Sequence, residues 1–423
     1  MTSRSAFLAI SGFLRLRGRT DIPLRAAWLR ATIALLSGSR KTERQAEFAW
    51  RRGDALAATA HWRALEREQP GRAAWPLKIS QAATERGDFD AAERTLFDAR
   101  ARGIDDSEVE AGLLRCARLG RRSNSAIDEA ETIAADPAAS LNQVFQAAFY
   151  LMARNRLEGA RAGFGRLLDH AKMGPLARGY LAAIDLMAEA RAKGRPDVPG
   201  WVSPAENSIL VREPSSDTLV VGFALPSSAL GLSLNGVHAM LSSRGVNALY
   251  LYDSRQVFHL AGTDRFGPGY QAMLGGIRAL AAELGTRRLI TLGGSATGYT
   301  AIRAALDLDA DGALAFGPAT LMLPTVSPGV ARSAHTLQRL IETVRPMMKD
   351  LRPLVRARAN GPRIEIYYSA QNRRDRMHAG NLAGLRGVTL HPIPGIERHD
   401  CLTEMARRGY RDLLDVFPAP GVS

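Results

Sequence analysis

The chain of 423 residues lacks the features that mark several specialised classes of protein. Its two cysteines, Cys116 and Cys401, lie far apart, so a disulfide framework is not expected and a reducing compartment is favoured. No CxxC or HExxH spacing suggests a metal site. No apolar run approaches the roughly 20 residues of a membrane-spanning helix. The apolar pieces near the N-terminus are too short for a secretory signal, so we expect a cytoplasmic protein without a metal.

Positive charge is what the chain has in excess, with a net charge of +14 at pH 7. Such a balance invites comparison with nucleic-acid-binding proteins. Half of the excess, however, lies in residues 1–45, so we expect no nucleic-acid partner. The N-terminal segment 1–38 is expected to be a solvated basic arm, or alternatively to contact an anionic membrane surface or an acidic partner. The charged residues of 1–45 are Arg4, Arg15, Arg17, Arg19, Arg25, Arg30, Arg40, Lys41 and Arg44 against Asp21 and Glu43.

The first half of the chain repeats with a step of 34 residues over about 39–174. Gly53-Asp54 recurs as Gly87-Asp88, and each unit predicts two amphipathic helices joined by a short turn. The turns "RRSN" and "NRLE" of the last two units lack glycine, so these units are degenerate. A capping helix is expected over 175–192. The fixed step argues against an irregular helical bundle. A small alanine that lets the two helices approach recurs at each step, as Ala58, Ala92, Ala126 and Ala160.

This period resembles that of the tetratricopeptide repeat family, which also is 34 residues. Pro70 closes one unit at the place expected for the family, and Ala99 stands at a small-residue position of the next. The resemblance implies stacked helix pairs with a concave surface that binds a peptide or protein partner. Fold alone does not name that partner.

A linker is predicted over 193–207, within a stretch that holds three prolines and two glycines. It separates the basic segment 1–38 and the repeats of 39–192 from a second domain over 208–423. We expect few contacts between the two domains, because interfaces within one chain are often small.

The second domain alternates strand-like and helical runs, which predicts a mostly parallel sheet covered on both faces. The chain is thus expected to be an α-helical array followed by an α/β domain. The strands "ILVRE" and "TLVVGFA" flank the turn "PSSD" and predict a hairpin. The later strands are "NALYLYD", "RLITLGG", "GALAFG", "RIEIYYS" and "VTLHPIP", with a long helical stretch over 333–350 before the fourth of them and a final helix from about residue 400.

The run "LITLGGSATGYTAI", residues 289–302, places Ser295 where a strand turns sharply into a helix. This setting is typical of a nucleophile elbow, in which a strained backbone exposes the serine hydroxyl above the sheet edge. Strand and helix pass closely there, so small residues are needed two positions before and after the serine. Gly293 meets that need. Thr297 stands where glycine is commoner and Gly298 follows, so the run departs from G-x-S-x-G at one position.

The run resembles the elbow of α/β-hydrolases, and the element order of 208–423 is similar to theirs, including an antiparallel opening of the sheet. A phosphate-binding loop is excluded, because no lysine precedes the last Ser or Thr. A dinucleotide-binding loop is excluded, because three strands precede the corner and the next strand ends without an acid. The sequence of the corner alone leaves open a third possibility, that Ser295 is an ordinary surface serine in a turn.

A catalytic serine needs a base that takes its proton and an acid that orients the base. In α/β-hydrolases these follow the serine in the order acid, then histidine. The resemblance implies Asp375, after "RIEIYYS", and His399, after "VTLHPIP", as the partners of Ser295. The alternative is that both are ordinary loop residues. The competing histidines are His391 in a strand, His378 at a helix start and His259 in the loop after the third strand.

Other charged residues surround these positions. Asp400 is expected to cap the last helix. Arg373, Arg374 and Arg376 crowd Asp375 and would favour its ionised form, or are simply solvated.

The oxyanion formed in acyl transfer needs two backbone donors. We expect one to be the amide of Ala296, after the serine, and the other to come from Ala224 or Leu225, after "TLVVGFA". Asp253 ends "NALYLYD" at the same sheet edge and would bind polar groups of a substrate, or else serve in a turn.

These features predict a serine hydrolase that acts on an ester without a cofactor and carries repeats for partner binding. Polar residues in the loop after "NALYLYD" favour a polar substrate, such as an acylated saccharide. Water or a sugar hydroxyl would accept the acyl group, which leaves hydrolase, acyl transferase and peptidase open. The rival hypothesis is a non-catalytic scaffold whose second domain has lost activity.

Overall fold

A computed structural model describes residues 33–34, 36–51, 54–104, 107–119, 126–195, 198, 207–225, 231–241, 245–253, 257–321, 349–358 and 360–417. Several sequence predictions lie outside these residues. They concern most of the basic segment 1–38, Gly53, the "RRSN" turn, most of the linker 193–207 and nearly all of the helical stretch 333–350. The division into domains at these boundaries stays a prediction.

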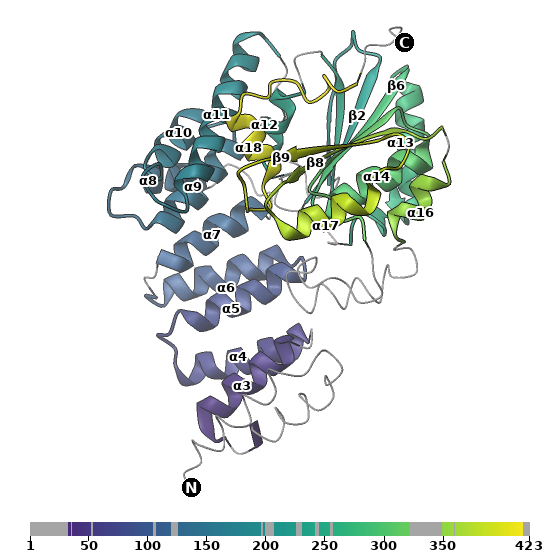
Figure 1. The fold of residues 1–423 in the computed structure, drawn as a ribbon. Helices are drawn as coiled ribbons and strands as arrows, with labels where there is room; N and C mark the ends of the chain where they lie inside the picture. Colours follow the sequence, from purple (N-terminus) through teal and green to yellow (C-terminus); the bar gives the residue numbers. More distant parts are fainter. Residues whose placement is uncertain are drawn as a thin grey trace.

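The first half is an array of helix pairs, as the 34-residue step predicts. Figure 1 shows the helices stacked in chain order, with α3 farthest from the sheet and α11 beside it. The arrangement fits tetratricopeptide-like repeats. The helices are α3 (Gly38–Arg51), α4 (Ala55–Glu68), α5 (Ala74–Glu85), α6 (Phe89–Ala101), α7 (Ser107–Leu119), α8 (Ile127–Ala135), α9 (Leu141–Ala153), α10 (Leu157–Gly165) and the capping helix α11 (Gly174–Ala192).

The turns within the helix pairs keep a residue with positive φ at the same position of the repeat even where that residue is not glycine. Gly87 has φ of 79°, and Asn155, two steps of the repeat later, has φ of 60°. Asparagine is one of the few residues that adopt this left-handed conformation readily. Each second helix in the first two pairs begins with an aspartate cap: Asp54 accepts from the amide of Ala57 at 2.9 Å, and Asp88 from that of Ala91 at 3.0 Å.

The recurring alanine is buried in three of the four pairs. Ala58, Ala92 and Ala160 are fully buried between their helices. The prediction is wrong for Ala126, which is only partly buried at the N-cap of α8. Helix α8 begins four residues later than the step from α6 would place it, so Ala130, one turn on, takes the buried position.

The second half contains a seven-stranded sheet in the order β1-β3-β2-β6-β7-β8-β9. Strand β1 is antiparallel to β3, and all other neighbours are parallel. A mostly parallel sheet is therefore confirmed. The strands are β1 (Ser208–Val211), β2 (Thr218–Ala224), β3 (Asn247–Tyr252), β6 (Arg288–Gly294), β7 (Gly312–Phe316), β8 (Arg363–Ser369) and β9 (Val388–Ile393), and a separate two-stranded ribbon joins β4 (Gly262–Thr263) to β5 (Gly267–Pro268).

The predicted hairpin of β1 and β2 is wrong. Strand β3 lies between them and pairs with both. All seven residues of β2 are buried, so β2 needs a neighbour on each edge as well as cover on each face. The short "PSSD" turn therefore reverses the chain without pairing the strands that flank it.

Helices cover both faces of the sheet, because side chains alternate along each strand. Val220 and Ala224 of β2 face one layer of helices, and Leu219, Val221 and Phe223 face the other. The first layer is α11, α12 (Leu234–Ala239) and α18 (Cys401–Arg407). The second is α13 (Tyr270–Glu283), α14 (Ala296–Leu308), α16 (Leu351–Arg356) and α17 (Arg373–Leu382).

The two halves share a core, so the expectation of few contacts between them is wrong. One cluster of buried side chains runs from Leu114 in α7, through α11, to Phe417 near the C-terminal end. Helix α11 packs against both α12 and α18. The capping helix thus covers one face of the sheet domain instead of facing solvent.

Candidate functional site

Ser295 forms a strained corner between β6 and α14. Its φ of 54° and ψ of −119° lie far from the conformations that residues other than glycine adopt readily. Its side chain makes no capping bond to α14. Strand and helix are so close that a Cβ built at Gly293 would lie 2.3 Å from the carbonyl oxygen of Thr297. Glycine at 293 is therefore required, as the elbow prediction expects.

Thr297 departs from the usual pattern and is held by its own hydroxyl group. Its Oγ1 donates to the carbonyl of Gly294 at 3.0 Å and lies 3.2 Å from the amide of the same residue. The side chain is fully buried. A threonine fits here because its hydroxyl bonds the last residue of β6. The small residue is needed one position later, where a Cβ on Gly298 would lie 2.8 Å from Cβ of Pro318.

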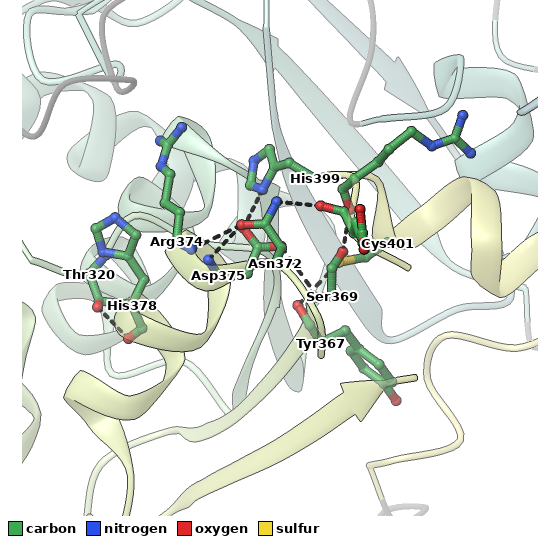
Figure 2. Close-up of polar contacts among 11 residues, drawn as sticks. Thr320, Tyr367, Ser369, Asn372, Arg374, Asp375, His378, His399 and Cys401 are labelled. Atoms are coloured by element: carbon green, nitrogen blue, oxygen red, sulfur yellow. Dashed lines mark hydrogen bonds and ion pairs between the residues drawn. The ribbon is translucent and has the colours of Figure 1, made fainter. Parts of the chain in front are cut away.

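His399 and Asp375 are paired, as Figure 2 shows. The Nδ1 atom of His399 lies 2.6 Å from Oδ1 of Asp375. Asp375 is 2% exposed, and its other carboxylate oxygen accepts from the amide of Ser369 at 3.3 Å. The His399 side chain is 31% exposed. Since an ionised carboxylate only accepts hydrogen bonds, Nδ1 carries a proton and Nε2 is left as the basic nitrogen of the neutral ring.

One backbone segment contacts all three residues. We call residues 316–320, the last residue of β7 and the four residues after it, the β7 exit segment. The amide of Ser295 donates to the carbonyl of Phe316 at 2.8 Å, and the amide of Ala319 donates to the carbonyl of Ser295 at 3.1 Å. Gly317 has φ of 52°, and a Cβ there would lie 2.7 Å from Cε1 of His399 and 3.4 Å from Oδ2 of Asp375. The segment therefore lies next to Ser295 and also next to the His399–Asp375 pair.

The link between Ser295 and His399 stays a prediction. In the part of the chain that the structure describes, no hydrogen bond joins Ser295 Oγ to His399. Catalytic hydrogen bonds are often long before substrate binds and shorten in the complex.

The three competing histidines have other partners. His391 Nε2 lies 2.5 Å from Oε2 of the buried Glu365. His259 is fully buried, its Nε2 lies 3.1 Å from the carbonyl oxygen of Leu251, and burial lowers its pKa. His378 Nδ1 accepts from the amides of Thr320 and Leu321, and burial lowers the pKa of His378 to about 4.

Sequence reasoning missed the residues that hold this site together. Gly317, Ser369 and His378 each bond or contact the catalytic candidates or the β7 exit segment. Asn372, the cap of α17, accepts from the amide of Asp375 at 3.1 Å and donates to the carbonyl of Glu397. An asparagine three residues before an acid at a helix start is the only one of these signals that the sequence displays.

The charged residues near Asp375 and His399 differ in detail from the sequence predictions. Asp400 stands at the N-cap of α18, but its side chain accepts from Thr403 Oγ1 at 2.5 Å instead of from a backbone amide. Burial raises the pKa of Asp400. Arg376 donates to the carbonyl of Ala370, and burial lowers the pKa of Arg374.

The candidate oxyanion donors meet at the sheet edge, although their roles stay predictions. Ala296 begins α14 directly after Ser295, and Ala224 ends β2 with Leu225 after it. The amide of Asp253 donates to the carbonyl of Ala224 at 3.1 Å, which ties the ends of β2 and β3 together. Asp253 is 5% exposed, so the proposed contact of its carboxylate with substrate also stays a prediction.

No group of three or more His, Cys, Asp or Glu side chains suited to a metal ion occurs among the described residues. Both cysteines are buried and free. Within the same part of the chain, no helix is long and apolar enough to cross a membrane. The cytoplasmic localisation stays a prediction.

Comparisons with known proteins identify no family. No family model and no curated protein matches the chain. One solved structure that is similar is a mutant of the O-GlcNAc transferase of Thermobaculum terrenum. The alignment has 14% sequence identity and covers 92% of this chain and 78% of that chain, with a TM-score of 0.20. A likeness this low carries no argument about fold or function.

Proposed function

We propose that residues 208–423 form an α/β-hydrolase domain in which Ser295 attacks an ester as a nucleophile. The observation that carries this proposal is the strained corner at Ser295 together with the His399–Asp375 pair, both of which lie next to the β7 exit segment. The order of these residues supports it, because the acid follows the strand two after the elbow and the histidine follows the last strand.

The proposed reaction is acyl transfer in two steps. His399 Nε2 takes the proton of Ser295 Oγ as the hydroxyl attacks the ester carbonyl, and Asp375 stabilises the imidazolium. The amides of Ala296 and of Ala224 or Leu225 would bind the oxyanion. His399 returns the proton to the leaving alcohol, which leaves an acyl group on Ser295. A second acceptor, activated by His399, then releases the acyl group and restores the free serine.

The second acceptor decides between a hydrolase and an acyl transferase, with a peptidase as a third form of the same chemistry. Water gives hydrolysis, and a sugar hydroxyl gives transfer. We favour a polar ester such as an acylated saccharide, from the polar residues after β3. The repeats would bind a peptide or protein partner on their concave surface.

The alternative function is a non-catalytic scaffold, in which the repeats bind a partner and the sheet domain is inactive. A fluorophosphonate probe separates the two, because it reacts with activated serines. The enzyme hypothesis expects labelling of the wild-type protein, no labelling of Ser295→Ala, and the same pattern for hydrolysis of p-nitrophenyl acetate. A folded wild-type protein that the probe leaves unlabelled would support the scaffold instead.

A further inference from the structure

The loop that carries His399 is held from both halves of the chain. Arg398, the residue before it, donates from Nη1 to the carbonyl of Lys172 at 3.3 Å, two residues before α11. The carbonyl of Arg398 accepts from Ser369 Oγ of β8 at 2.6 Å. The residue directly before His399 is therefore anchored both to the sheet and to the repeat array.

Helix α18, which starts two residues after His399, lies directly against α11. A Cβ built at Gly179 of α11 would lie 2.3 Å from Cγ2 of Thr403 and 2.6 Å from the Thr403 carbonyl oxygen. Glycine at 179 allows the two backbones this approach. Thr403 Oγ1 also donates to the carboxylate of Asp400, the residue after His399. A displacement of Thr403 would therefore displace Asp400 and, with it, His399.

The contact between α11 and α18 is apolar and well buried. Leu402, Met405 and Ala406 of α18 are at most 2% exposed and share a core with Ala183 and Ile184 of α11. An ion pair between Glu189 of α11 and Arg411 lies at the edge of this contact. Without α11, the apolar face of the helix that follows His399 would meet water.

We propose that α11, the last helix of the repeat array, positions His399 for the reaction, with Gly179 as the positioning residue. This inference rests on the proposed function and extends it. The repeat array is then part of the framework of the active site, besides any role in binding a partner. A side chain at 179 displaces α18 and turns His399 away from Asp375, because the backbone carbonyl of Thr403 cannot move aside alone.

The test compares Gly179→Ala with Gly165→Ala in the full chain. Gly165 ends α10, and a Cβ there would have no atom within 4 Å, so this control should leave the rates within about two-fold. Gly179→Ala should lower the fluorophosphonate labelling rate and kcat for p-nitrophenyl acetate by roughly 10- to 100-fold, because small misplacements of catalytic groups have effects of this size. KM should change little.

The labelling rate constant of the folded protein distinguishes positioning from simple loss of folded protein. Misplacement of His399 lowers this rate constant while all of the folded protein can still be labelled. Loss of folded protein lowers the amount that is labelled and leaves the rate constant unchanged.

A second variant covers the case in which Gly179→Ala does not fold. Arg398→Met removes the contact with Lys172 at an exposed position, and should slow labelling by about two- to five-fold, as expected for one exposed hydrogen bond. A labelled wild-type protein with unchanged rates in the folded variants would overturn the positioning role alone. An unlabelled wild-type protein would overturn this role and the proposed function together.

Discussion

The repeat region and the sheet region each turn a corner on a residue other than glycine with positive φ, and the two corners are held differently. Asn155, between α9 and α10, has φ of 60°, which asparagine adopts with little strain. Its side chain donates to the carbonyl of Val198 at 3.2 Å and accepts from Asn235 of α12 at 2.6 Å. This repeat corner thus helps to join the two halves.

Ser295 has a less favourable conformation and is held by its backbone instead. Its amide and carbonyl both bond the β7 exit segment, and its hydroxyl group makes no capping bond to α14. Strain of this kind persists only where the surroundings fix it. Changes around Ser295 should therefore affect reaction rate, whereas changes at the repeat corner should affect stability.

The largest effect is expected from Asp375→Asn. An amide in place of the carboxylate favours the wrong tautomer of His399, which should lower kcat by about 10³- to 10⁴-fold. Thermal unfolding should show a folded protein. Asp98→Asn, at an exposed position on α6, is the control from the repeat region and should keep the wild-type rate. Turnover of Asp375→Asn within ten-fold of wild type would contradict the pairing.

A smaller loss of rate is expected from Gly317→Ala. The new Cβ would collide with His399, so turnover of p-nitrophenyl acetate should fall by about 10-fold. Gly384→Ala is a matched control, because Gly384 also has positive φ, of 73°, but no atom within 4 Å of its Cβ position. Both variants place an alanine at positive φ, so equal rates in the two would show that contact with His399 is unimportant.

A substitution at the repeat corner, Asn155, should lower stability and leave the reaction rate nearly unchanged. Asn155→Gly keeps the left-handed turn but loses two partly buried hydrogen bonds, so unfolding free energy should fall by about 1–2 kcal/mol. Urea unfolding measures this change, and the labelling rate of Ser295 in the folded protein should stay within about two-fold of wild type. Gly87→Asn makes the reverse exchange at the equivalent turn and should alter stability by less than about 1 kcal/mol. A large loss of rate in Asn155→Gly would erase the contrast between the corners.

The smallest effects concern acid stability. Burial alone would raise the pKa of Glu365, but hydrogen bonds from His391 and Arg363 outweigh burial and lower that pKa below its ordinary value of 4.5. A folded-state pKa below the unfolded one stabilises the protein above pH 4.5 and ceases to do so as pH falls through the folded value. Unfolding measured from pH 7 to pH 3 should therefore depend less on pH in Glu365→Gln.

Glu189 in the repeat region offers the contrasting case. Hydrogen bonds from Lys193 and Arg411 lower its pKa too, but the carboxylate is exposed. Water and salt screen such a pair, so Glu189→Gln should change the pH dependence less than Glu365→Gln, and added salt should reduce the difference further. Equal changes in the two variants would show that burial of Glu365 does not matter.

The sequence by itself determined the features that depend on local spacing. The 34-residue step predicts the paired helices, because helix, turn and cap are each set within a few residues. Alternating runs predict the strands, and the small Gly293 before Ser295 predicts the tight corner. The local pattern fails at Ala126, because α8 begins four residues later than the 34-residue step from α6 places it, and the composition gives no sign of that shift.

Only the tertiary structure decided which distant elements meet. Strand β3 lies between β1 and β2 because the fully buried β2 requires neighbours on both edges, and a short turn between two strands does not reveal this. Asp375 meets His399 through the capping of α17 and the bare backbone of Gly317. Helix α11 joins the sheet domain because its apolar side chains and Gly179 match α18. Each of these is a packing match between segments far apart in the chain, where no local pattern exists.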